Sequence, residues 1–80
     1  MKIEIRLLPQ LKRYLPNPDI AGDTQMIDMK NEATIKDVLI ELGIPLDMPK
    51  VILLNQKQGK LEDNLKDGDR IAVFPPVGGG

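Results

Sequence analysis

The clearest local signal in the chain is a single amphipathic helix at residues 34–43. Thr34 is a favourable N-cap residue, and Asp37 follows it at the spacing of a capping box. Gly43 stands where a left-handed residue commonly ends a helix. The apolar stripe between these signals consists of Ile35, Val38, Leu39 and Leu42. One helix can cover only one face of a sheet, so the sequence predicts an α+β domain in which the other face of the sheet is open.

Three segments alternate between apolar and polar residues and are therefore predicted as half-buried strands. They span residues 2–8, 24–29 and 70–74. Their expected inward side chains are Ile3, Ile5, Leu7, Ile27, Met29, Ile71 and Val73. Leu11, Tyr14 and Leu15 have helical spacing, and we expect them to form a lid on the core. Residues 55–59 read as a turn, and residues 60–61 as a short edge segment.

Residues 51–54 are four consecutive apolar residues, which predicts a strand that is apolar on both faces. Either the pair Val51 and Leu53 or the pair Ile52 and Leu54 then lies on the open face. Alternatively, the linker or the first loop covers that pair, and the sequence does not choose between these arrangements. An exposed apolar patch of this kind usually marks a partner surface. The predicted docking residues are Ile52, Leu54, Arg70 and Phe74.

The composition excludes most side-chain chemistry, because the 80 residues include no cysteine, no histidine and no serine. Disulfides, the usual zinc sites and serine or cysteine nucleophiles are thereby ruled out, so we expect neither catalysis by the chain alone nor a metal site. A net charge of −1 and only two aromatic residues give no basis for nucleic-acid binding. The chain has no long apolar run and no signal-peptide pattern, and we expect a soluble, cytoplasmic protein that binds no membrane.

The chain ends with Phe74-Pro75-Pro76-Val77-Gly78-Gly79-Gly80, where two prolines precede three glycines. Prolines fix φ and bias the residues before them toward extended geometry, whereas glycines add no steric bulk. The segment therefore predicts a stiff stalk with a thin tip, able to carry the terminal carboxylate roughly 20 Å into a narrow tunnel. A frayed end or a cloning remnant would fit the same residues.

The predicted order of elements resembles the β-grasp, or ubiquitin-like, fold. Residues 65–80 add a Leu-Lys-Asp-Gly-Asp turn, a strand, Phe-Pro-Pro-Val and terminal glycines, and they resemble the MoaD branch of the MoaD/ThiS sulfur carriers. Residues 51–55 are similar to the apolar strand that closes on an Asn turn in that family. One departure is Gln56, because the family commonly has glycine there, and we expect this turn to be built differently.

The resemblance implies a particular α+β architecture. It is a β-grasp domain with a mixed sheet of four to five strands and one main helix packed on one face, formed by residues 1–74. Residues 75–80 would follow it as a flexible glycine-rich tail.

The resemblance also implies a carrier that has no catalytic side chains and binds no cofactor. A ubiquitin-activating-type adenylyltransferase would adenylate the carboxylate of Gly80 with ATP, and a persulfide sulfur donor would convert it to a thiocarboxylate. In the MoaD branch the tail enters the large subunit of molybdopterin synthase, where its sulfur builds the dithiolene of molybdopterin or the related tungsten cofactor. The residues expected to enter partner active sites are Pro75, Pro76, Val77, Gly78, Gly79 and Gly80.

Three other functions stay compatible with the sequence. The chain could deliver sulfur to thiazole, although Pro75-Pro76 weakly favours the molybdopterin branch. It could be a ubiquitin-like modifier that is ligated to lysines through Gly80. It could also be a plain interaction domain with an inert tail.

Overall fold

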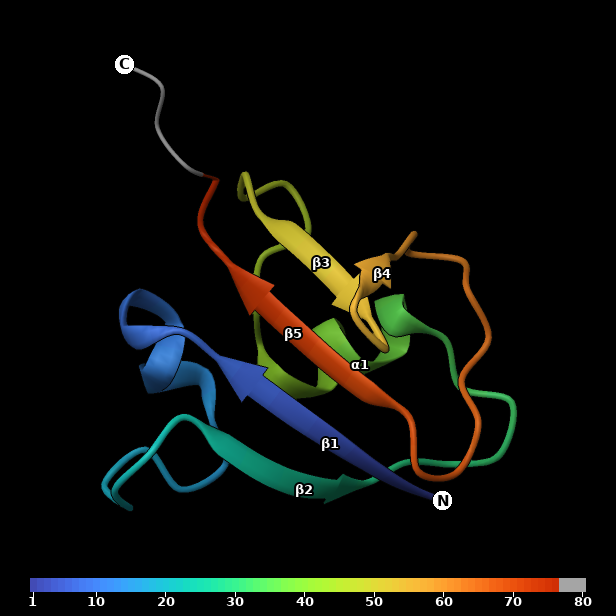
Figure 1. Cartoon of the computed structure of the whole chain (residues 1–80), viewed down its shortest axis with the longest axis horizontal. Helices are drawn as coiled ribbons and strands as arrows, with labels where there is room; N and C mark the ends of the chain where they lie inside the picture. The colour runs from blue at the N-terminus through green and yellow to red at the C-terminus, as the bar shows by residue number, and fades with distance from the viewer. Residues whose placement is uncertain (77–80) are drawn as a thin grey trace.

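The described part of the chain forms one mixed sheet of five strands with a single α-helix on one side (Figure 1). This computed structural model describes residues 1–76. The elements in chain order are β1 (Lys2–Leu7), the 3-10 helix η1 (Pro9–Tyr14), β2 (Thr24–Asp28), α1 (Ile35–Leu42), β3 (Val51–Leu54), β4 (Lys57–Gln58) and β5 (Arg70–Phe74). The expected α+β architecture is therefore confirmed, and the sheet has five strands where four to five were expected.

The first and last strands lie side by side in the middle of the sheet. The strand order is β2-β1-β5-β3-β4, and only the β1–β5 pair is parallel. In this pair Ile5 lies opposite Ile71 and Leu7 lies opposite Val73. All four side chains are buried, as expected for a parallel pair at the centre of a sheet.

Helix α1 has the start and end that the sequence predicts. The Thr34 hydroxyl accepts a hydrogen bond from the Asp37 main-chain N–H at 3.3 Å, and the Asp37 carboxylate accepts one from the Thr34 N–H at 3.0 Å. The hydrogen bond from the Thr34 N–H is the main reason why the pKa of Asp37 is below its ordinary value of 3.8. Gly43 ends the helix in the left-handed region with φ 78°.

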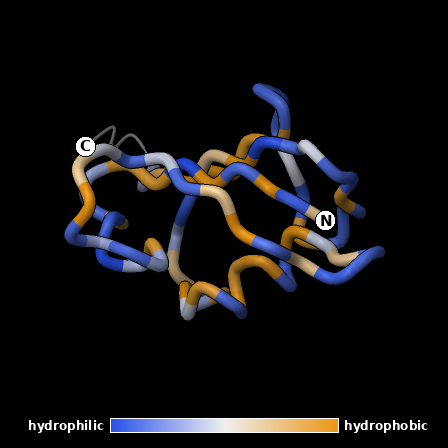
Figure 2. Tube along the Cα trace, turned by 90° about the horizontal axis from the view of Figure 1, so that it is seen from below, coloured by the Kyte–Doolittle hydropathy of each residue, from blue (hydrophilic) through white to orange (hydrophobic). Residues whose placement is uncertain are grey.

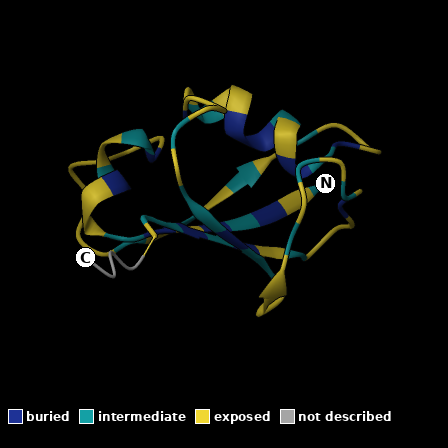
Figure 3. Cartoon of the chain, turned by 90° about the horizontal axis from the view of Figure 1, so that it is seen from above, coloured by how far each residue is buried: buried dark blue, intermediate teal, exposed yellow. Residues whose placement is uncertain are grey.

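The core lies between the sheet and the two helices. Figure 3 shows α1 and η1 on the same side of the sheet, and Figure 2 shows hydrophobic stretches along both the helix and the strands. Leu11 and Leu15, from η1 and its C-cap, are buried and close one end of the core, as expected. The other fully or nearly fully buried apolar residues are Ile3, Ile5, Leu7, Ala33, Ile35, Val38, Leu39, Ile44, Leu65, Ile71 and Val73.

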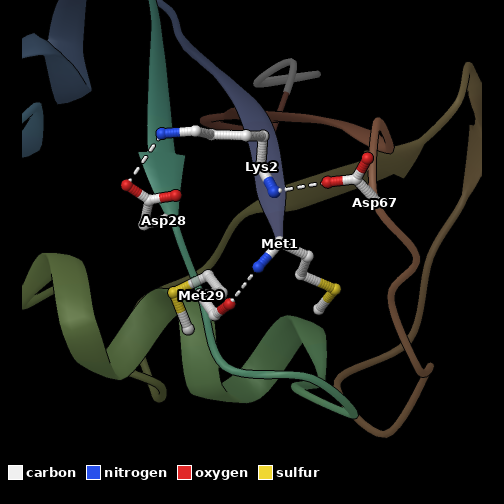
Figure 4. Close-up of polar contacts among 5 residues, drawn as sticks. All are labelled: Met1, Lys2, Asp28, Met29 and Asp67. Atoms are coloured by element: carbon white, nitrogen blue, oxygen red, sulfur yellow. Dashed lines mark hydrogen bonds and ion pairs between the residues drawn. The ribbon is translucent and has the colours of Figure 1, made fainter.

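The N-terminal residues are tied to two distant parts of the chain (Figure 4). The Met1 ammonium group donates to the Met29 carbonyl at 2.7 Å, and the Lys2 main-chain N–H donates to the Asp67 carboxylate at 2.7 Å. The Lys2 side chain also pairs with Asp28 at 2.9 Å. These contacts hold the start of β1 against the end of β2 and the turn before β5.

The β3–β4 hairpin corrects the sequence prediction for residues 55–61. Asn55 and Gln56 both have positive φ, at 51° and 71°, as a two-residue type I′ turn requires. Lys57 is thereby placed opposite Leu54, so β4 begins inside the predicted turn, and residues 60–61 form no strand. The Asn55 side chain holds the turn in place through hydrogen bonds to Asp69 and the Arg70 N–H, both at 3.0 Å.

Candidate functional site

The face of the sheet opposite α1 carries a strip of four apolar side chains. It is formed by Val51, Leu53, Ala72 and Phe74, and we call it the apolar strip. The pairing of β3 with β5 places Val51 opposite Phe74 and Leu53 opposite Ala72. All four residues are half-buried, although their neighbours along each strand face the core. Apolar side chains gathered on a face that no element of residues 1–76 covers indicate a surface for a partner.

Two of the four predicted docking residues lie on the wrong face. Ile52 is 9% exposed and lies opposite the buried Val73. Leu54 lies opposite the buried Ile71 and packs against the core. The prediction that Ile52 and Leu54 face a partner was therefore wrong, because the pairing with β5 turns Val51 and Leu53 outward instead. Phe74 and Arg70 do lie on the open face, and their role in docking stays a prediction.

Charged side chains border the apolar strip on its β1 side. The Arg70 Nε lies 3.6 Å from the Glu4 carboxylate, and the Arg6 Nε donates to Asp23 at 3.3 Å. A hydrogen bond from the Thr24 hydroxyl, and then the contact with Arg6, lower the pKa of Asp23. In each ion pair the arginine side chain is more than half exposed and the carboxylate side chain is about one-third exposed, so solvent screens the pair and it contributes little to stability. Their main effect is to set the pattern of charge beside the strip.

The root of the tail is continuous with the apolar strip. Phe74 ends β5 next to the start of β3, Pro75 is half-buried and Pro76 is exposed (Figure 1). The remaining predicted tail residues, namely Val77, Gly78, Gly79 and Gly80, lie outside the described residues. Their entry into partner active sites stays a prediction.

Among residues 1–76, no group of three His, Cys, Asp or Glu side chains is arranged to hold a metal ion. In the same residues, no helix has the length and apolar character needed to cross a membrane.

The structure places Ala72 and four further residues on the open face that the docking prediction did not include. Val51 and Leu53 lie there instead of Ile52 and Leu54. Glu4 and Arg6 of β1 lie beside Arg70 and Ala72 of β5 in the parallel pairing. The alternation in β1 already placed Glu4 and Arg6 on a polar face. Only the parallel pairing of the two strands shows that this face is the one next to the apolar strip.

Comparison with solved structures finds the same fold in proteins of low sequence identity. SAMP1 from Haloferax volcanii superposes with a TM-score of 0.76 at 24% identity, and the match covers 100% of both chains. A candidate molybdopterin converting factor subunit 1 from Pyrococcus furiosus gives 0.74 at 21% identity, covering 96% of this chain and 99% of that one. A chain in the protein–protein complex of subunits 1 and 2 of the molybdopterin-converting factor from Helicobacter pylori gives a TM-score of 0.64 at 26% identity, and the match covers 100% of both chains. The fold is therefore the ubiquitin-like β-grasp fold.

Sequence comparison supplies the family. A search of curated proteins finds no significant match. The profile of the ThiS family matches residues 17–80, which is well over half of the sequence and includes the whole tail. The chain belongs to the ThiS family of small ubiquitin-like sulfur carriers.

Proposed function

We propose that this chain is the small subunit of molybdopterin synthase, a sulfur carrier that works through the carboxylate of Gly80. The thiocarboxylate at Gly80 would donate sulfur to the dithiolene of molybdopterin, or of the related tungsten-pterin cofactor. The observation that carries the proposal is the ThiS-family match over residues 17–80, because it includes the tail that bears the carboxylate. The Helicobacter pylori complex of subunits 1 and 2 supports a large-subunit partner, since its match covers the full length of this chain.

The proposed chemistry needs a partner enzyme, because a carboxylate is a poor acyl donor. In the adenylyltransferase, a carboxylate oxygen of Gly80 attacks the α-phosphorus of ATP, and pyrophosphate leaves. The terminal sulfur of a persulfide donor then attacks the acyl carbon, and AMP leaves. A thiol reduces the resulting acyl persulfide, which releases the thiocarboxylate and leaves a disulfide.

The open face gives this proposal a docking surface. The apolar strip ends at Phe74, the last residue before the two prolines, so a partner that covers the strip also lies at the root of the tail. Burial of such apolar area contributes about 25 cal/mol per Å² before the costs of association. We infer that docking is separate from the reaction at Gly80 and takes place on residues of the folded domain.

The test is to incubate the full chain with the adenylyltransferase of its own organism, ATP and a persulfide donor, and to measure the intact mass. We expect a mass increase equal to the exchange of one oxygen for one sulfur, and fragmentation should place it on Gly80. A chain that lacks Gly79 and Gly80, and a reaction without ATP, are the matched controls. An unchanged mass of the full chain would refute the carrier proposal.

The alternative functions give different products in the same reaction. A ubiquitin-like modifier would form a ladder of higher-mass conjugates through Gly80, whereas a thiazole carrier would form the thiocarboxylate but not supply molybdopterin synthase. The Haloferax volcanii neighbours, described as small archaeal modifier proteins, share the fold at 23–24% identity. Addition of the large synthase subunit and the pterin precursor distinguishes a small subunit of molybdopterin synthase from a thiazole carrier.

A further inference from the structure

The open face contains a shallow hollow of about 190 Å³ beside the apolar strip. Leu53 and Ala72 of the strip contribute apolar surface to it, and Glu4, Arg6, Arg70 and Gln56 supply polar groups around it. Arg6 lies opposite Ala72, and Glu4 lies opposite Arg70, in the parallel pairing of β1 with β5. Two guanidinium groups therefore border the same apolar hollow.

Most of the hydrogen-bond donors of these two guanidinium groups have no acceptor among residues 1–76. The Arg70–Glu4 contact of 3.6 Å is an ion pair but is too long for a hydrogen bond. Arg6 donates only through Nε, to Asp23 at 3.3 Å. Each guanidinium group carries five N–H donors, so most of them are satisfied by water in the free protein.

A partner that covers the apolar strip would remove much of this water. The Arg70 side chain is 70% exposed and the Arg6 side chain is 58% exposed, so both have much solvent contact to lose. A guanidinium group that loses water without gaining an acceptor destabilises the complex. Glu4 is the only carboxylate that lines the hollow within the described part of the chain, and it already faces Arg70. Asp23 pairs with Arg6 from outside the hollow and occupies only its Nε, and Glu4 accepts no hydrogen bond from Arg70. An acceptor from the partner is therefore needed for the N–H donors that these two carboxylates leave without a partner when the face is covered.

We propose that the hollow receives an Asp or Glu side chain of the large synthase subunit, set next to an apolar residue that contacts Leu53 and Ala72. Arg70 donates to this carboxylate with its planar pair of N–H groups, and Arg6 donates from the neighbouring strand. The inference rests on the proposed function, because it names the chemistry of the partner at that docking surface. Arg70 and Arg6 then select the partner, whereas the apolar strip supplies most of the buried area.

The test measures binding of the full-length chain to the purified large subunit of molybdopterin synthase from the same organism. We expect Arg70→Glu to raise the Kd about tenfold or more at low ionic strength. The difference should shrink when the salt concentration rises from about 50 mM to about 500 mM, because salt screens the charges. Arg70→Lys should also weaken binding, although less, because lysine keeps the charge but loses the planar pair of donors.

Lys57→Glu is the matched control, since it makes the same charge change at an exposed residue of β4 that does not line the hollow. We expect its Kd to stay within about twofold of the wild-type value. Thermal unfolding of each variant confirms that the domain is folded. Equal weakening by Lys57→Glu and Arg70→Glu would overturn the inference, because only overall charge would then matter.

Three further outcomes also decide the question. If the wild type binds and Arg70→Glu binds with the same Kd, the inference is overturned and the carrier proposal still stands. Absence of wild-type binding overturns both the inference and the synthase role, while the mass test at Gly80 still judges the sulfur carrier. Self-association of the wild type that Arg70→Glu abolishes would assign the hollow to a second copy of the chain and overturn the inference.

Discussion

Val51 lies directly opposite Phe74 in the antiparallel pairing of β3 with β5, and both side chains are half-buried on the open face. Phe74 is therefore both a member of the apolar strip and the last residue before the two prolines. The strip and the root of the tail are therefore parts of one surface, which a partner can cover while it binds at the root.

The first prediction concerns Phe74. We expect Phe74→Ala to weaken binding of the large synthase subunit about tenfold or more, because aromatic side chains often dominate the binding energy of an interface. Calorimetric titration measures the Kd. Ile40→Ala is the control, since Ile40 is a 57% exposed apolar residue on α1, on the other side of the sheet. Equal Kd values for wild type and Phe74→Ala would show that the apolar strip is not the docking surface.

The second prediction concerns Gly59, which packs against the N-terminal end of α1. A Cβ atom at this position would lie 2.8 Å from Ile35 Cδ1 and 3.3 Å from Leu54 Cβ. We expect Gly59→Ala to reduce the free energy of unfolding by about 1–3 kcal/mol through overpacking. Urea denaturation of the single variant and of Gly59→Ala with Ile35→Val tests the cause. Valine lacks the Cδ1 atom, so the double variant should recover part of the loss, and a purely additive loss would contradict this explanation.

The third prediction concerns the capping box of α1. Thr34→Ala removes the hydroxyl that accepts from the Asp37 N–H and should lower the free energy of unfolding by about 1 kcal/mol. Thr24→Ala, at an exposed position of β2, is a control for the same substitution outside the helix. A similar loss in both variants would show that capping is not the cause.

The fourth prediction concerns the pH dependence that Asp37 contributes. Its pKa in the folded chain is lower than the ordinary value, chiefly because the Thr34 N–H donates to the carboxylate. The unfolded chain therefore takes up the proton first as the pH falls. The stabilisation is fully present above the ordinary Asp pKa, and it is lost as the pH falls through the lower pKa of the folded chain.

Denaturation of wild type and Asp37→Asn at a series of pH values measures this contribution. The wild type should be the more stable at neutral pH, and the difference should shrink in the acidic range. Asp19→Asn, in an exposed loop, controls for the loss of one negative charge. A difference between wild type and Asp37→Asn that is independent of pH would contradict the prediction.

The fifth prediction concerns Lys50, whose ammonium group holds the loop before β3. It donates to the main-chain carbonyls of Pro45, Leu46 and Met48 at 3.0, 2.9 and 2.7 Å. We expect Lys50→Met to lower the free energy of unfolding by about 1–3 kcal/mol, because these acceptors lose a charged donor. Lys57→Met, at an exposed position of β4, is the matched control. Amide hydrogen exchange should show faster exchange in residues 44–50, and unchanged exchange there would refute the role.

Local signals in the sequence predicted most of the fold. Thr34 and Asp37 mark the start of α1, and Gly43 marks its end. The alternation in β1 separates the buried Ile3 and Ile5 from their polar neighbours. These features depend on neighbouring residues alone, so they can be read without knowledge of the rest of the chain.

The misplaced residues all depend on contacts between distant segments. Four apolar residues in a row contain no alternation, so only the pairing with β5 shows that Ile52 faces the core and Leu53 does not. Lys57 and Gln58 carry no apolar pattern and become a strand because the positive φ values of the preceding turn place them beside β3. The hollow forms through the parallel pairing of Arg6 with Ala72, which are far apart in the sequence.

The central place of β5 also has a mechanical consequence. A partner that pulls on the tail loads β5 along its own axis, and β5 is hydrogen-bonded to β1 on one side and to β3 on the other. Such a load must shear both ladders together, whereas a strand at the edge of the sheet would peel away one bond at a time. Under the proposed function, the domain would therefore resist unfolding when a partner draws in the residues that follow Phe74.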